Sequence, residues 1–148
     1  FLHRNLQGKA PIVYGDGQQM RCFSYIDDTL QVFDEICFGS KSASETFNIG
    51  PDEDYVTIND LAKMCANATG YNGPPEYMPD RPKEVKYATC SADKIRKYFD
   101  YKTQVSLSEG IHKTLDFIRK RGIKKFNYSL PIEIDNEHTP QTWTKKLI

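Results

Sequence analysis

Two arginines in stiff loops are the side chains of this sequence best suited to bind an anion. Arg21 follows a Gly-Asp-Gly turn and two glutamines (residues 15–19), and Arg81 lies in a Pro-Asp-Arg-Pro loop that leaves it little entropy to lose on binding. A guanidinium is planar and can hold two phosphate oxygens at once. The pattern indicates a phosphate or diphosphate site. Composition alone favours the alternative that both are surface groups paired with Asp16 and Asp80.

The motifs of a self-contained enzyme are incomplete. The sequence has no G-x-x-x-x-G-K-[ST] phosphate loop and no H-E-x-x-H zinc motif, and a dinucleotide fingerprint that begins at Gly15 fails at Met20, where its third glycine would fall. Tyr98 and Lys102 have the spacing of a Tyr-x-x-x-Lys acid/base pair, but Asp100 is expected in the turn after a helix, which would separate them. We therefore assign no catalytic, cofactor-binding or metal-binding residue.

The histidines and cysteines suggest no further site. The three histidines are isolated from one another, and the four cysteines contain no C-x-x-C pair, which argues against a zinc ribbon. Cys37 and Cys65 lie on apolar faces of expected helices, so we expect reduced core thiols in a cytoplasmic protein.

Apolar periodicity and turn residues predict the elements that position the two loops. Helices are expected at about 27–38, 58–69, 92–99 and 107–121, and short strands at 11–14, 19–25, 46–49 and 76–78. Thr57-x-x-Asp60 resembles a capping box, and Ser106-x-x-Glu109 is one. The order predicts a mixed α/β or α+β body with about four helices and without a full parallel sheet.

Length and charge exclude several classes of protein. The chain has 148 residues, 20 basic and 20 acidic side chains, and a net charge of zero. No apolar run approaches the roughly 20 residues of a membrane-spanning helix. Zero net charge argues against a general nucleic-acid or membrane-surface binder. The abrupt start at Phe1, without methionine, suggests a fragment of a longer protein.

Four blocks, in this order, resemble the C-terminal, substrate-binding part of an extended short-chain dehydrogenase/reductase. The first (11–28) has a strand, a glycine turn, an arginine, an aromatic residue and a hydrophobic-Asp helix start. The second (45–50) is a strand that ends in Asn-Ile-Gly, the third (81–94) an arginine loop before a helix start, and the fourth (106–111) Ser-Leu-x-Glu-Gly-Ile. More narrowly, the chain resembles an NAD-dependent nucleotide-sugar epimerase of the UDP-glucose 4-epimerase type.

The resemblance divides the chain in two and assigns roles to five residues. Residues 1–122 would be the nucleotide-sugar-binding domain and 123–148 a C-terminal tail, which is similar to the tail of one branch of these enzymes. It implies that the following residues bind substrate: Arg21 and Arg81 at the diphosphate, Glu84 at the ribose hydroxyls, and the strand from Ile12 to Tyr14 beside the base. Departures from the family at Cys22, Lys83 and Asp100 leave the sugar open.

In such enzymes an N-terminal Rossmann half holds NAD and the catalytic Tyr/Lys pair. The resemblance thus implies a UDP-sugar substrate, the chain's own Rossmann half as partner, and no activity of this chain alone. A homodimer of the full-length enzyme is possible, and no nucleic-acid or membrane partner is expected. Three alternatives stay open: a nucleotide-sugar dehydratase or decarboxylase of the same superfamily, a non-catalytic nucleotide-sugar-binding or assembly module, and an α/β domain without a ligand.

Overall fold

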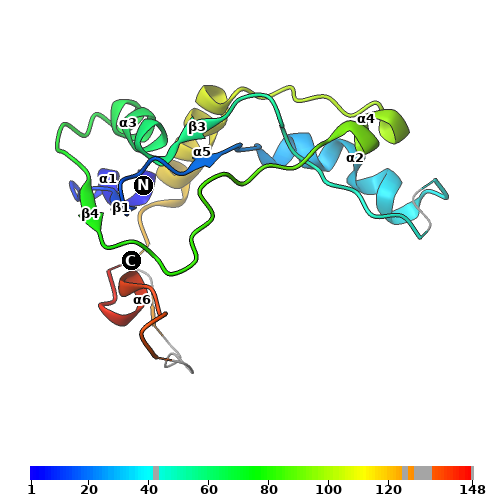
Figure 1. Ribbon diagram of the computed structural model, residues 1–148. Coiled ribbons are helices and arrows are strands. Elements are labelled where there is room, and N and C mark those ends of the chain that lie inside the picture. Colours follow the sequence, from blue (N-terminus) through cyan, green and yellow to red (C-terminus); the bar gives the residue numbers. More distant parts are fainter. Residues whose placement is uncertain (42–43, 125–126, 129–134, 148) are drawn as a thin grey trace.

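The computed structural model describes residues 1–41, 44–124, 127–128 and 135–147 as a mixed α/β fold with short strands. The helices are α1 (Leu2–Leu6), α2 (Ile26–Phe38), α3 (Ile58–Thr69), α4 (Asp93–Phe99), α5 (Leu107–Arg121) and α6 (Gln141–Thr144), and the strands are β1 (Ile12–Tyr14), β2 (Met20–Arg21), β3 (Val56–Thr57) and β4 (Glu76–Met78). The molecule is elongated (Figure 1): α1, α3, β1 and β4 gather at one end, and α2 and α4 lie at the other. The predicted fold class and the four long helices are confirmed.

A parallel pair of strands underlies one end of the molecule. β1 and β4 pair with Ile12 beside Glu76 and Tyr14 beside Met78. Val13, in the centre of β1, is completely buried, and β1 also contacts α3. Because the strands are parallel, their carboxyl ends lie at the same edge of the sheet, and the loops that follow β1 and β4 both start there.

A second pairing brings the segment after the Arg81 loop against Arg21. β2 and β3 are antiparallel, with Met20 beside Thr57 and Arg21 beside Val56. On the other side of β2, Met20 forms a parallel bridge with Tyr87, and its amide donates to the Lys86 carbonyl at 2.9 Å. Two segments far apart in the sequence therefore run side by side at this point.

Helices α3 and α5 begin at the two predicted caps. The Thr57 hydroxyl accepts a hydrogen bond from the Asp60 amide (3.0 Å), and the Ser106 hydroxyl accepts one from the Glu109 amide (3.3 Å). The two helices contact each other, and α3 also contacts α1. Leu115 of α5 is buried. Capping and packing thus agree in fixing this end of the fold.

The far end has a small core of its own. Val32 of α2, Ile95 of α4 and the ring of Tyr101 are buried together with Ala92. The ring of Phe47 packs edge-on against Phe99 at the margin of this cluster, with the ring centroids 5.2 Å apart. Half of α2 is therefore covered by α4 and the loops around it.

The other face of α2 is apolar but uncovered. Ile26, Leu30 and Phe33 remain 57%, 54% and 49% exposed. A helix that is apolar on both faces is normally buried on both. The outward face of α2 therefore has the composition of a surface that another chain segment or domain covers.

Two sequence expectations are wrong. Residues 46–49 form no strand, because a strand needs a hydrogen-bonding neighbour and none of the described residues pairs with them. All four cysteines are free, but only Cys65 is buried, and Cys37 is exposed on the outward face of α2. Burial raises the pKa of the Cys65 thiol, which keeps it protonated. The cytoplasmic location stays a prediction.

No helix among the described residues is long and apolar enough to cross a membrane.

An ion pair joins the segment between α2 and β3 to α4. The Asp52 carboxylate accepts two hydrogen bonds from Arg96 (2.5 and 3.0 Å) and one from the Ala92 amide (2.8 Å). These bonds, with that from Arg96 the strongest, lower the pKa of the Asp52 carboxyl from 3.8 to about 2. Because the folded-state pKa lies below the unfolded value, the stabilisation is complete above the unfolded pKa and disappears as the pH falls toward the folded one.

We expect D52N to lower the free energy of unfolding by about 1–3 kcal/mol near neutral pH. The difference from the natural chain should shrink between about pH 4 and pH 2, as protonation removes the same interaction. Urea unfolding over this range measures it, with D54N, at an exposed carboxylate, as the control. A difference that does not change with pH would contradict the assignment.

Candidate functional site

The candidate site lies where β1 and β4 end. The loop that carries Gln19 leaves the carboxyl end of β1, and the loop that carries Arg81 leaves the carboxyl end of β4. The Gly15 amide still donates to the Met78 carbonyl at 2.9 Å, so the two loops start together. Ligands of open α/β sheets commonly bind at such an edge.

The glycine turn of the first loop fits closely against its neighbours. Gly15 and Gly17 have φ of +63° and +70°. A Cβ on Gly15 would come within 1.9 Å of the Asp80 carboxylate, and one on Gly17 within 2.1 Å of the Asn59 side chain. The Asn59 side chain also donates to the Asp16 carbonyl at 2.8 Å. Only glycine permits both the positive φ and the close approach.

Arg21 and Arg81 meet on a single carboxylate. Arg21 Nη2 lies 2.9 Å from Glu84 Oε1, and Arg81 Nε lies 2.6 Å from Glu84 Oε2. The alternative partners considered from the sequence, Asp16 and Asp80, are not the ones that these arginines use. The Glu84 carboxylate thus bridges the two guanidinium groups.

The two arginines differ in how much of their bonding capacity the fold uses. Arg21 also donates to the Met20 and Val85 carbonyls (both 2.7 Å), so it fastens the second loop to β2. Arg81 is 43% exposed, pairs through Nε, and rests on the Tyr14 ring with its guanidinium carbon 4.8 Å from the centroid. Arg81 is therefore the better placed of the two to present donors to a ligand.

A polar cavity of about 390 Å³ opens beside Arg81. It is lined by Asp16, Gln19, Asp80, Arg81, Lys83, Glu84 and Lys86. Its volume lies in the range of small-molecule sites, and its lining carries both positive and negative groups.

Gln19 is a site residue that the sequence interpretation did not single out. It is 8% exposed, and its Nε2 donates to the Tyr14 carbonyl at 2.8 Å. Its Oε1 has no hydrogen-bond partner among the described residues. A buried amide oxygen without a donor is uncommon. The only signal in the sequence is the pair of amide side chains after the glycine turn.

Two of the five predicted substrate residues border this cavity directly, and the others do not. Arg81 and Glu84 line it, and Arg21 and Tyr14 reach it through their contacts with these two. Ile12 lies at the amino end of β1, beside Glu76, away from the edge at which the loops leave.

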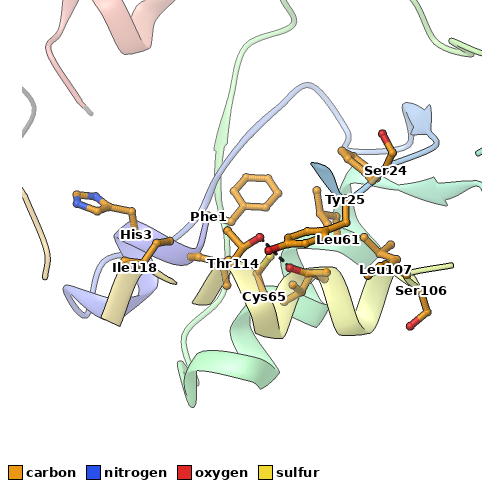
Figure 2. Close-up of a pocket in the computed structure, with 15 residues that line it drawn as sticks. Phe1, His3, Ser24, Tyr25, Leu61, Cys65, Ser106, Leu107, Thr114 and Ile118 are labelled. Carbon is orange, nitrogen blue, oxygen red and sulfur yellow. Dashed lines mark hydrogen bonds between the residues drawn. The ribbon is translucent and has the colours of Figure 1, made fainter. Parts of the chain in front are cut away.

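A more apolar cavity of about 400 Å³ lies elsewhere, between α1, α3 and α5 (Figure 2). Phe1, Leu61, Leu107 and Ile118 point into it, and Tyr25 lies across it. The lining is mostly apolar and has no arginine or lysine, whereas the cavity beside Arg81 has one arginine and two lysines. We therefore place the candidate site at the arginine cavity.

The structure also separates the Tyr98 and Lys102 pair. α4 ends at Phe99, and Asp100 takes a left-handed conformation with φ of +49°. Lys102 lies beyond that turn and pairs with Asp100. Among the described residues there is also no cluster of three or more side chains that could hold a metal ion.

Comparison with known proteins gives a consistent group of relatives. No family model matches the chain. It is 28% identical over 121 residues to UDP-glucose 4-epimerase of Mycolicibacterium smegmatis, a match that covers 82% of this chain and 38% of the relative. It is 29% identical over 119 residues to dTDP-glucose 4,6-dehydratase of Escherichia coli, covering 76% and 33%. The chain therefore spans about a third of the length of the curated relatives that it matches.

The solved structures that resemble this chain are of the same kinds of enzyme as its sequence relatives. UDP-glucose 4-epimerase of Thermotoga maritima, in a structure with UDP-glucose, superimposes with a TM-score of 0.70 at 29% identity, covering 81% of this chain and 38% of that one. UDP-glucuronic acid 4-epimerase of Bacillus cereus, in complex with UDP-glucuronic acid and NAD, gives 0.73 at 27% identity, covering 82% and 38%. The chain matches the C-terminal part of extended short-chain dehydrogenases/reductases. The predicted resemblance is confirmed.

The NAD that binds to such a dehydrogenase/reductase does not fit the residues of this chain. Its glycine turn leads into β2 rather than into a helix. The helix whose start meets the turn is α3, and its first two amides, of Ile58 and Asn59, already donate to the Gln19 and Gly17 carbonyls (both 3.0 Å), so they are not offered to a pyrophosphate. The space beside Gly15, where a dinucleotide loop lets the pyrophosphate approach, is filled by the Asp80 carboxylate. We therefore derive no step through NAD from this chain.

Proposed function

We propose that this chain is the substrate-binding portion of an NAD-dependent nucleotide-sugar epimerase similar to UDP-glucose 4-epimerase. Its part of the activity is to hold the nucleoside diphosphate of a UDP-sugar. The convergence of Arg21 and Arg81 on Glu84, at one edge of a polar cavity, is the observation that carries the proposal.

In this proposal the two arginines have different roles. Arg81 has two terminal amino groups to offer to diphosphate oxygens, since its Nε already serves Glu84. Arg21 holds the backbone of the second loop in place and adds positive charge from the other side of Glu84. Charge-assisted hydrogen bonds of this kind contribute about 1.5–3 kcal/mol each.

Two acceptors complete the recognition that we propose. Gln19 lines the cavity, and its Oε1 has no hydrogen-bond partner among the described residues, so we assign it to a hydroxyl or N–H of the ribose, sugar or base. The Glu84 carboxylate is a second acceptor at the same cavity and is the group that we assign to the ribose hydroxyls. Tyr14 supports Arg81, and we place the strand from Ile12 to Tyr14 beside the base.

We further propose that the chain is inactive alone and needs a Rossmann half that brings NAD and a catalytic tyrosine and lysine. The exposed apolar face of α2 (Ile26, Leu30 and Phe33) supports this, because it has the composition of a covered surface. The short span of the chain relative to its relatives supports it as well. Homodimerisation of the complete enzyme remains a prediction from the resemblance.

A dehydratase or decarboxylase is the second candidate, favoured by the matches to dTDP-glucose 4,6-dehydratase and, at 23% identity, to UDP-glucuronic acid decarboxylase 1 of Danio rerio. All of these reactions require an anchored nucleoside diphosphate. The nucleotide part of the ligand distinguishes the dTDP-dependent case.

A thermal-shift experiment tests the proposal. At about 100 times its dissociation constant, UDP is expected to stabilise the chain by about 2.7 kcal/mol. Uridine, which lacks the diphosphate, is the matched control and should give little shift. A larger shift with dTDP than with UDP would favour the dehydratase, and no shift with any nucleotide would contradict nucleotide-sugar binding.

A further inference from the structure

The tail folds back onto the carboxyl end of β1. The Thr142 amide donates a hydrogen bond to the Tyr14 hydroxyl at 2.8 Å, and that hydroxyl donates to Thr142 Oγ1 at 3.0 Å. Thr142 belongs to α6, whose first amides have no partner within the helix. One tyrosine thus satisfies one of these amides and holds the threonine side chain.

A second contact fastens the tail to the same pair of strands. Arg4 Nη1 donates to the Leu147 carbonyl at 2.7 Å. Its Nε donates to the Ala10 carbonyl just before β1 (2.6 Å), and its Nη2 pairs with Glu76 at the start of β4 (3.2 Å). The tail is therefore held at two points: at Thr142, on the carboxyl end of β1, and at Leu147, through an arginine that also bonds next to the starts of β1 and β4.

The same Tyr14 ring is the support of Arg81. The Arg81 guanidinium lies over the ring, 4.8 Å from its centroid, and its side chain is 43% exposed. A side chain so exposed loses rotamer entropy when it binds a ligand, unless a neighbour already restricts it. The orientation of the Tyr14 ring therefore affects how readily Arg81 binds.

We propose that residues 135–147 form a strap that positions Arg81 through Tyr14, with Thr142 as the positioning residue. This inference rests on the proposed function, because it assigns the strap to the same diphosphate site. Thr142 does not touch the ligand. Its hydroxyl fixes the hydroxyl of Tyr14, and the ring then keeps the guanidinium directed at the cavity.

The test compares Thr142→Val, which keeps the shape and removes the hydroxyl, with Thr142→Ser, which keeps the hydroxyl. We expect Val to weaken UDP binding by about 3- to 10-fold, the equivalent of one neutral hydrogen bond, and Ser to restore the affinity of the natural chain. Tyr14→Phe keeps the ring and loses both bonds to Thr142, whereas Thr142→Val keeps the bond from the backbone amide, so Tyr14→Phe should weaken UDP binding at least as much as Thr142→Val. NMR titration with UDP gives the affinities, and its spectra report whether each variant is folded.

A double-mutant cycle separates positioning from a purely structural role. In an Arg81→Ala background the Thr142→Val change should no longer weaken UDP binding, because the group that it positions is gone. An equal loss in both backgrounds, or no loss in either, overturns the inference and leaves the proposed function intact. If the natural chain does not bind UDP, both the inference and the proposed function fail.

Discussion

Arg81→Ala is expected to weaken UDP binding by about 1.5–3 kcal/mol, or roughly 10- to 150-fold, while the stability of the chain stays nearly unchanged. Arg81 is partly exposed, and its fold contacts are an ion pair with Glu84 and the face of Tyr14. Little of the fold therefore depends on it, whereas a diphosphate would lose its most accessible pair of donors. Calorimetric titration with UDP gives the affinity, and thermal unfolding without ligand gives the stability.

Three comparisons sharpen this prediction. Arg81→Lys keeps the charge but not the planar fork, so it should fall between the natural chain and alanine. Arg119→Ala removes an exposed charge of α5 that does not line the cavity, and it should leave the affinity for UDP unchanged. Arg21→Ala should reduce both affinity and stability, because Arg21 also bonds to the Val85 carbonyl. Equal affinity of Arg81→Ala and the natural chain would remove Arg81 from the site.

Ile95→Ala is expected to lower the free energy of unfolding by about 2–5 kcal/mol. Ile95 is completely buried in the small core that joins α2 and α4, where few neighbours are available to refill a cavity. Denaturant unfolding measures the loss. Phe38→Ala, at an 88% exposed side chain on α2, is the matched control and should change stability by no more than about 0.5 kcal/mol. A similarly small change in stability for Ile95→Ala would mean that the end of the molecule with α2 and α4 does not depend on the core around Ile95.

Local chemistry explains which parts of the fold could be predicted from the sequence. The caps at Thr57 and Ser106 and the glycine turn at Gly15 depend on residues within one turn of each other, so the sequence alone reveals them. The segment 46–49 has strand composition, but a strand also requires a neighbour, and composition does not say where that neighbour is.

Periodicity has a similar limit in α2. It identifies the helix, and it identifies Ile26, Leu30 and Phe33 as one apolar face. It does not say which face the chain itself covers, because Val32 and Ile36 form another apolar face, and that is the one packed on α4. Burial is decided by what the helix meets in three dimensions, not by its own pattern.

In the candidate site, too, residue type predicts some features, and tertiary structure decides the others. The two arginines could be chosen from residue type and loop stiffness. Their meeting on Glu84 depends on the β1–β4 pairing and on the Met20–Tyr87 bridge, neither of which has a local signal. The buried amide of Gln19 and the contact of Thr142 with Tyr14 depend on tertiary packing as well.

The parallel pairing of β1 with β4 has a consequence for how the chain folds. Because Ile12 lies beside Glu76, this sheet closes only after a long stretch of polypeptide has been brought back on itself, which is entropically costly and slow. The polar cavity beside Arg81 forms with that closure and is lost with it. A bound diphosphate should accordingly slow hydrogen exchange of the amides of β4 more than those of α2, so that ligand and late-forming sheet protect each other.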